Sequence, residues 1–101
     1  MSEQSAALTR RVLVPNRRGL HARAAAKFVS LAERFGASVD VRAAVNGQDG
    51  GEPVSARSIM GLMMLGAGQG ASLVLRAEGW DAKEALDALA ALVESGFNER
   101  D

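Results

Sequence analysis

The chain has 101 residues, 48% of them hydrophobic, and its 12 basic residues balance 12 acidic ones. This length suits one small domain, so we expect a single domain over 1–101 with loose tails at 1–7 and 98–101. Zero net charge argues against a general nucleic-acid binder. The chain has no cysteine and one histidine, which excludes disulfides, thiolate metal sites and multi-histidine metal sites. Since neither a signal peptide nor an apolar run long enough to cross a bilayer is visible, we expect a cytoplasmic protein that does not bind membranes.

The first half of the chain predicts a strand, a helix and a hairpin. Residues 11–14 form a short β-type run that ends at a proline. Residues 22–35 place apolar side chains at three- and four-residue spacings, which predicts an amphipathic helix. Residues 38–43 alternate between apolar and polar, as in a half-buried strand. Two Gly-containing turn signals between 45 and 53 then lead to a short edge strand at 54–56.

The second half adds a short helix, a strand and a longer helix. Ser58 is a plausible N-cap for an apolar helix of about two turns. Residues 72–78 alternate as a fourth strand. The last helix starts at Asp81 and Glu84, which resemble a capping box, and stops at Gly96. This order, with one apolar face on each strand, predicts an α+β fold, an open-faced two-layer sandwich whose helices cover one side of the sheet.

His21, the only histidine, lies where a glycine-marked loop gives way to the helix predicted from residue 22. The first N–H groups of a helix have no intrahelical partner, and the helix dipole adds partial positive charge there, so this end suits an anion such as phosphate. Arg23 adds a fixed cation with donors suited to phosphate oxygens. A neutral imidazole is a good nucleophile for a phosphoryl group. The alternative is that His21 is only a solvated surface residue or a weak cap.

The short helix after Ser58 is apolar almost all round, which is unusual for its length. Leu62 and Leu65 can face the core, which leaves three apolar side chains over: Ile59, Met60 and Met63. Methionine is common at adaptable binding surfaces, and exposed apolar patches often mark contact sites. The residue pattern alone leaves open whether these side chains form such a patch or fill a small core.

Two stretches carry a resemblance to a known family. Residues 14–25, which read VPNRRGLHARAA, resemble the active-site stretch of the histidine-containing phosphocarrier proteins, HPr, of the bacterial phosphoenolpyruvate-dependent phosphotransferase system. Residues 58–66, which read SIMGLMMLG, resemble the second motif of that family. The motifs occur in the family's order, and the resemblance runs from about Arg11 to Phe97. It implies a four-stranded antiparallel sheet in the order 1-4-2-3.

The resemblance also implies a role for individual residues. His21 matches the histidine that enzyme I phosphorylates on Nδ1 and that passes the group to enzyme IIA-type acceptors. Arg23 matches the arginine beside the phosphoryl group. Ser58 matches the serine that an HPr serine kinase/phosphorylase modifies in many relatives. The residues that match the partner-docking patch are Ile59, Met60 and Met63.

A protein of this kind carries a transient phosphohistidine and is not a self-contained enzyme. We therefore expect a monomer without cofactor or metal, acting in sugar uptake or its regulation. The alternative from another class is a regulatory interaction domain of the nitrogen-related branch, NPr, which acts by docking and is controlled through Ser58. An intact histidine stretch favours the carrier, because a pure docking module has no need of the histidine.

The chain departs from the family pattern at several places. Ala24 replaces the usual proline of the first helical turn, which the site chemistry does not require. The loop 44–53 is longer than usual. Ser30 and Glu33 replace basic residues that flank the docking patch in enteric relatives, so partner choice can differ. The ending at residues 95–97 looks more like the NPr branch.

Overall fold

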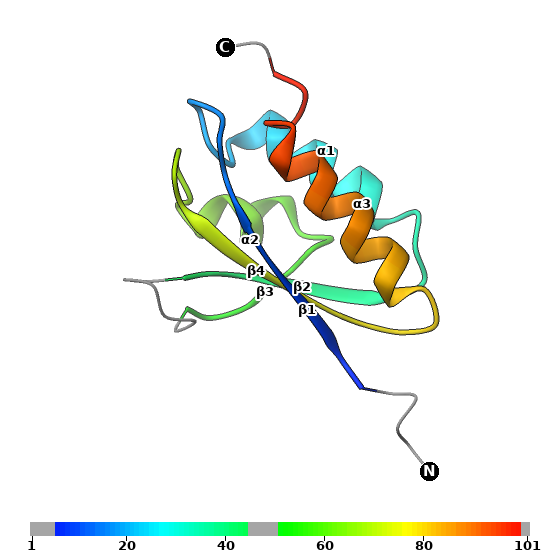
Figure 1. The fold of residues 1–101 in the computed structure, drawn as a ribbon. Helices are drawn as coiled ribbons and strands as arrows, with labels where there is room; N and C mark the ends of the chain where they lie inside the picture. The colour runs from blue at the N-terminus through cyan, green and yellow to red at the C-terminus, as the bar shows by residue number, and fades with distance from the viewer. Residues whose placement is uncertain (1–5, 45–50, 100–101) are drawn as a thin grey trace.

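This computed structural model describes residues 6–44 and 51–99, which form four strands and three helices (Figure 1). The elements are β1 (Leu8–Leu13), α1 (Ala22–Ala32), β2 (Ser38–Ala43), β3 (Val54–Ser55), α2 (Ile59–Met64), β4 (Ser72–Glu78) and α3 (Ala82–Glu94). Their order is the predicted one, and the bounds of β2 and β4 are the predicted bounds. In the described part of the chain, no helix is both long and apolar enough to cross a bilayer.

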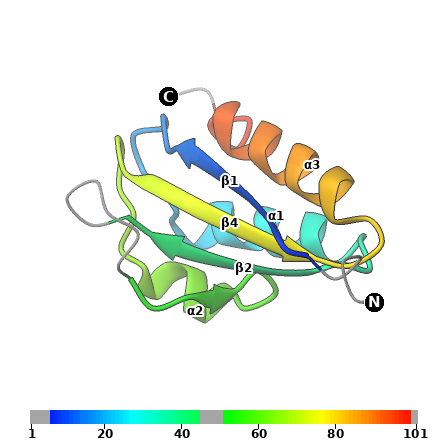
Figure 2. The ribbon, with the colours of Figure 1, turned by 60° about the horizontal axis from the view of Figure 1, so that its bottom comes forward.

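The sheet has the order β1-β4-β2-β3, and every neighbouring pair is antiparallel, as expected. Figure 2 shows α1 behind the sheet, α3 beside β1 at one margin and α2 beside β3 at the other. β1 starts at Leu8, three residues before its predicted start, because six consecutive residues of β1 pair with β4 from Leu8↔Ala77 to Leu13↔Ser72. β3 is a short edge strand that pairs only with Asp40 and Val41 of β2. The predicted turn signals at 46–47 and 49–50, between β2 and β3, lie outside the described residues.

The core lies between the sheet and the helices. Inward-facing side chains of alternate strand residues meet the apolar stripes of α1 and α3, which run side by side in Figure 1. The largest fully buried side chains are those of Phe28, Phe97, Leu62, Leu73, Leu75, Leu89, Val14, Val41 and Val93. The apolar periodicity read from the sequence therefore identifies the core face of each helix.

The end of α1 and the start of α3 differ from the prediction. α1 ends at Ala32 and not near Phe35, and the chain after it turns toward the start of α3. Asp81 occupies the N-cap position of α3, but its side chain does not cap that helix. Its buried carboxylate accepts hydrogen bonds from the backbone N–H groups of Gly36 (2.9 Å) and Ala37 (2.8 Å). Two donors from a distant segment thus satisfy Asp81, which ties the α1–β2 turn to α3.

The predicted glycine stop of α3 is confirmed. The N–H of Gly96 donates to the carbonyl of Val93, and the N–H of Phe97 donates to the carbonyl of Leu92, both at 2.9 Å. These two bonds form a Schellman motif, and the fully buried ring of Phe97 supplies its apolar contact.

Asn98 and Glu99, which the sequence assigns to the C-terminal tail, form a turn with internal hydrogen bonds. After Gly96, the residues Phe97 and Asn98 also have left-handed backbones, with φ of 58° and 61°. The N–H of Glu99 then donates to the carbonyl of Gly96 at 3.0 Å. Residues 96–99, the C-terminal hook below, turn the chain back toward the loop between β1 and α1.

Candidate functional site

His21 is the N-cap residue of α1, as its place in the sequence predicts. Its backbone is extended (φ −79°, ψ −179°), and its ring Nδ1 accepts a hydrogen bond from the backbone N–H of Arg23 at 3.3 Å. The imidazole therefore lies over the first turn of the helix, where backbone N–H groups and the helix dipole favour an anion.

Arg23 is exposed in the first turn of α1. Among the described residues, its guanidinium group has no hydrogen-bond or ion-pair partner. A side chain in this state is available to an incoming anion, since no internal contact has to be broken first. The predicted pair of His21 and Arg23 is thus brought together at one helix end.

Glu99 is a further member of this site, and no pattern in the sequence indicates it. One of its carboxylate oxygens bonds to Nε2 of His21. Its other oxygen accepts a hydrogen bond from Nδ2 of Asn16 at 2.9 Å, and the same amide donates to the carbonyl of Gly19 at 2.9 Å. The side chains of His21 and Glu99 are 21% and 12% exposed. The hydrogen bond from His21, followed by that from Asn16, lowers the pKa of Glu99 even though burial opposes the shift.

Two features hold the C-terminal hook in place against its backbone strain. A non-glycine residue in the left-handed region costs about 1–3 kcal/mol, and the hook has two in succession. The ring of Phe97 is fully buried, and Nζ of Lys27 donates to the carbonyl of Phe97 at 2.6 Å. Lys27 lies one helical turn beyond Arg23, so the sequence predicts that the two side chains share one face of α1. No regular spacing in the sequence predicts that Glu99 or Asn16 lies next to His21.

The loop before His21 depends on a glycine. Gly19 has φ of +64°, and a Cβ atom there would lie 2.4 Å from the carbonyl oxygen of Ala67. The next residue, Leu20, donates its N–H to that same carbonyl at 2.9 Å. These contacts join the histidine loop to the loop that follows α2, so the two sequence motifs meet in space.

The short helix α2 has two distinct faces. Oγ of Ser58 accepts a hydrogen bond from the N–H of Gly61 at 2.9 Å, which confirms the predicted N-cap. Leu62 is fully buried, and Leu65 packs against the core only in part. The exposed apolar side chains of this helix, called the α2 patch below, are Ile59, Met60, Met63 and Met64. The alternative that the first three fill the core is therefore wrong, and Met64 enlarges the exposed surface.

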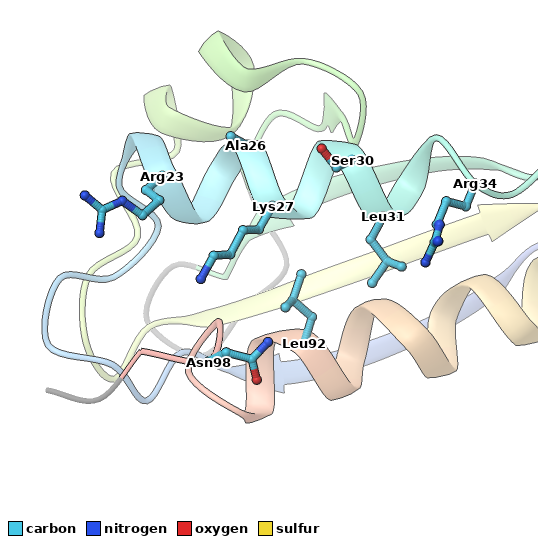
Figure 3. A pocket seen from close by; sticks show the side chains of 8 residues that line it. All are labelled: Arg23, Ala26, Lys27, Ser30, Leu31, Arg34, Leu92 and Asn98. Atoms are coloured by element: carbon cyan, nitrogen blue, oxygen red, sulfur yellow. The ribbon is translucent and has the colours of Figure 1, made fainter.

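A groove of about 710 Å³ lies between α1 and the C-terminal part of α3 (Figure 3). Leu31 and Leu92 form its apolar floor, Arg23 and Lys27 line it from α1, and Arg34 lines it from the turn after α1. His21 does not line this groove. The ring lies instead at the N-terminal end of α1, where it is bonded to Glu99.

Comparison with known proteins places the chain in a family. A family model described as the PTS HPr component phosphorylation site matches residues 8–95. Phosphocarrier protein NPr of Shewanella violacea is 44% identical over 92 residues, which cover 91% of this chain and 94% of the relative. Phosphocarrier protein HPr of Cupriavidus necator is also 44% identical over 92 residues, which cover 91% of this chain and 97% of the relative.

A solved structure agrees with these relatives. The crystal structure of HPr-C-His from Thermoanaerobacter tengcongensis superposes with a TM-score of 0.80 at 40% identity and covers 93% of this chain and 99% of that one. Fold and matched sequence together define a small phosphocarrier. The chain belongs to the HPr family, which includes the HPr and NPr proteins of the phosphotransferase system.

Proposed function

We propose that this protein accepts a phosphoryl group from enzyme I on Nδ1 of His21 and passes it to enzyme IIA-type proteins. The observation that carries the proposal is the ring of His21 at the N-terminus of α1, with Nδ1 directed at the first-turn N–H of Arg23. A phosphoryl group on that nitrogen would meet the positive end of the helix dipole.

Each part of the site has a task in this transfer. The lone pair of Nδ1 attacks the phosphorus, and the bond from phosphorus to the donor atom of enzyme I breaks. Backbone N–H groups of the first turn and the free guanidinium of Arg23 hold the arriving oxygens. The transfer then runs in the opposite sense to the next protein, so His21 ends unmodified. No cofactor is needed for this cycle.

The α2 patch is proposed as the partner-docking surface. Its exposed side chains Ile59, Met60 and Met63 belong to the helix whose following loop is bonded to the histidine loop. A partner seated on this patch would therefore have its reacting group near His21. We place the protein in the cytoplasm as a single-domain monomer, acting in sugar uptake or its regulation.

Ser58 is proposed as a regulatory site for an HPr serine kinase/phosphorylase. Its hydroxyl is the N-cap of α2 and lies next to Ile59 and Met60. A phosphate there would add about two negative charges beside an apolar surface that a partner must bury. The same features support the second candidate, a docking module of the NPr branch in which His21 is secondary. Relatives of both names match equally well, which favours the carrier activity that the two names share.

The test is incubation with enzyme I and labelled phosphoenolpyruvate, followed by mapping of the label. We expect label on His21 that is lost in acid and stable in base, as a phosphoramidate is. His21→Ala should abolish labelling, while Ser58→Ala, the matched control in the other motif, should retain it. Acid-stable label on another residue would contradict the carrier function, and regulation that survives His21→Ala would favour the docking module.

A further inference from the structure

Phosphoryl transfer uses one nitrogen of His21, but both ring nitrogens have a hydrogen-bond partner in the structure. Nδ1 accepts the N–H of Arg23 at 3.3 Å, and Nε2 bonds to the carboxylate of Glu99. The contact between Nε2 and Glu99 has no role in the transfer steps of the proposed function. Glu99 lies 78 residues from His21 in the chain, so a particular tertiary arrangement is needed to place it there.

The two contacts together determine where the ring proton lies. A neutral imidazole has one donor and one acceptor nitrogen. Nδ1 faces a backbone N–H and must be the acceptor, while Nε2 faces an ionised carboxylate, which only accepts, and must be the donor. Both partners therefore favour the tautomer in which Nε2 has the proton and the Nδ1 lone pair accepts the N–H of Arg23.

Glu99 is held for this contact by groups outside its own segment. Asn16, a buried residue, donates to its other oxygen at 2.9 Å, and Lys27 holds the hook through the carbonyl of Phe97 at 2.6 Å. Two successive left-handed residues, Phe97 and Asn98, bring Glu99 to the ring. Strained backbone of this kind clusters at functional sites, where the surrounding structure maintains it.

We propose that Glu99 is a positioning residue for phosphoryl transfer, whose carboxylate holds the ring proton on Nε2 and orients Nδ1 toward the incoming group. The proposal rests on the proposed function, in which His21 is the acceptor. As the Nδ1–phosphorus bond forms, the bond to the donor atom of enzyme I breaks and its electron pair stays with enzyme I. The proton remains on Nε2 throughout, and the positive charge that develops on the ring lies against the carboxylate of Glu99. A carboxylate behind a reacting or ligating histidine has the same orienting effect in other sites.

The first measurement needs no transfer partner. Because His21 is the only histidine, ¹⁵N labelling of histidine gives two ring-nitrogen signals, both from the site. At a pH where the ring is neutral, we expect the wild type to show a protonated Nε2, an unprotonated Nδ1, and a slowly exchanging Nε2–H. Glu99→Ala should lose the slow exchange and shift toward a mixture of tautomers. Glu99→Gln keeps one acceptor oxygen, for which the donors of His21 and Asn16 compete, and should retain more of the wild-type tautomer than Glu99→Ala does.

The second measurement is the rate of phosphorylation by enzyme I as a function of protein concentration. Glu99→Ala should lower kcat by roughly tenfold or more, the range expected when the carboxylate that orients a histidine is removed. KM should hardly change, because Glu99 is not part of the α2 patch. Glu99→Gln should recover part of the rate. Glu84→Gln, an exposed glutamate in the first turn of α3, is the matched control and should behave as the wild type.

The outcomes separate this inference from the carrier function. If the wild type is not phosphorylated on His21, the proposed function fails, and the role of Glu99 in transfer fails with it. If the wild type is phosphorylated but Glu99→Ala has the same tautomer and the same kcat, only the role of Glu99 is overturned. Faster transfer by Glu99→Ala would also overturn it, because Glu99 would then cover the ring and inhibit transfer.

Discussion

The two faces of α2 allow the docking proposal to be tested by one pair of substitutions. Met60 is 68% exposed and Leu62 is 0% exposed, although they are two residues apart on the same short helix. We expect Met60→Asp to weaken binding to enzyme I while the domain stays folded. Leu62→Asp should unfold the domain.

The magnitudes follow from burial. Truncating a fully buried leucine costs about 2–5 kcal/mol, and an unpaired carboxylate left in its place costs several kcal/mol more. This sum reaches the total stability of a small domain, about 5–15 kcal/mol. At Met60 the new carboxylate remains in water near a helix N-terminus, so stability should change by no more than about 0.5 kcal/mol. Loss of a central apolar contact should weaken enzyme I binding by about tenfold or more.

Thermal unfolding followed by circular dichroism and titration calorimetry with enzyme I measure the two effects. Leu8→Asp is the matched control, since Leu8 is a 43% exposed apolar residue at the start of β1, away from α2. It should change neither the melting temperature nor the affinity appreciably. A folded Leu62→Asp together with an unfolded Met60→Asp would show that the faces of α2 are assigned wrongly. Normal enzyme I binding by a folded Met60→Asp would refute the α2 patch as the docking surface.

Three further predictions concern the ends of the helices. Arg23→Ala should slow phosphoryl transfer to His21 without changing the melting temperature, because the side chain is exposed; unfolding of this variant would contradict its assignment to the site. Ser58→Ala should cost about 1 kcal/mol as a lost N-cap and transfer normally. Ser58→Asp should keep its melting temperature yet transfer slowly, and a normal rate would leave Ser58 as a cap only. The hydrogen bond from His21 lowers the pKa of Glu99 in the folded state. The ionised carboxylate therefore stabilises the fold at pH values above its ordinary pKa of 4.5, and this stabilisation is lost as the pH falls through the lowered pKa. The melting temperature of the wild type should therefore exceed that of Glu99→Gln at neutral pH, and the two values should converge in acid. A difference in melting temperature that does not depend on pH would contradict this stabilisation.

The sequence by itself determines those features that arise between residues close together in the chain. Apolar spacing locates the core faces of α1 and α3, because side chains three and four residues apart share one side of a helix. The same local chemistry predicts His21 and Ser58 as N-caps, since a cap acts on N–H groups two or three residues away. Strand alternation and element order lead to the sheet and its helix-covered face. The family motifs add the strand order and the expected roles of His21 and Arg23.

Only the tertiary structure decides the contacts between distant segments. Asp81 bonds to the turn after α1 across 44 and 45 residues, and this use of its carboxylate overrides the cap that its position suggests. Glu99 reaches His21 across 78 residues through left-handed backbone at Phe97, a conformation that a bulky side chain does not signal. Sequence spacing encodes neither contact, because each depends on where whole helices pack on the sheet. The sequence thus locates the reacting histidine, whereas the packing of α3 against α1 and the β1–α1 loop decides what lies behind its ring.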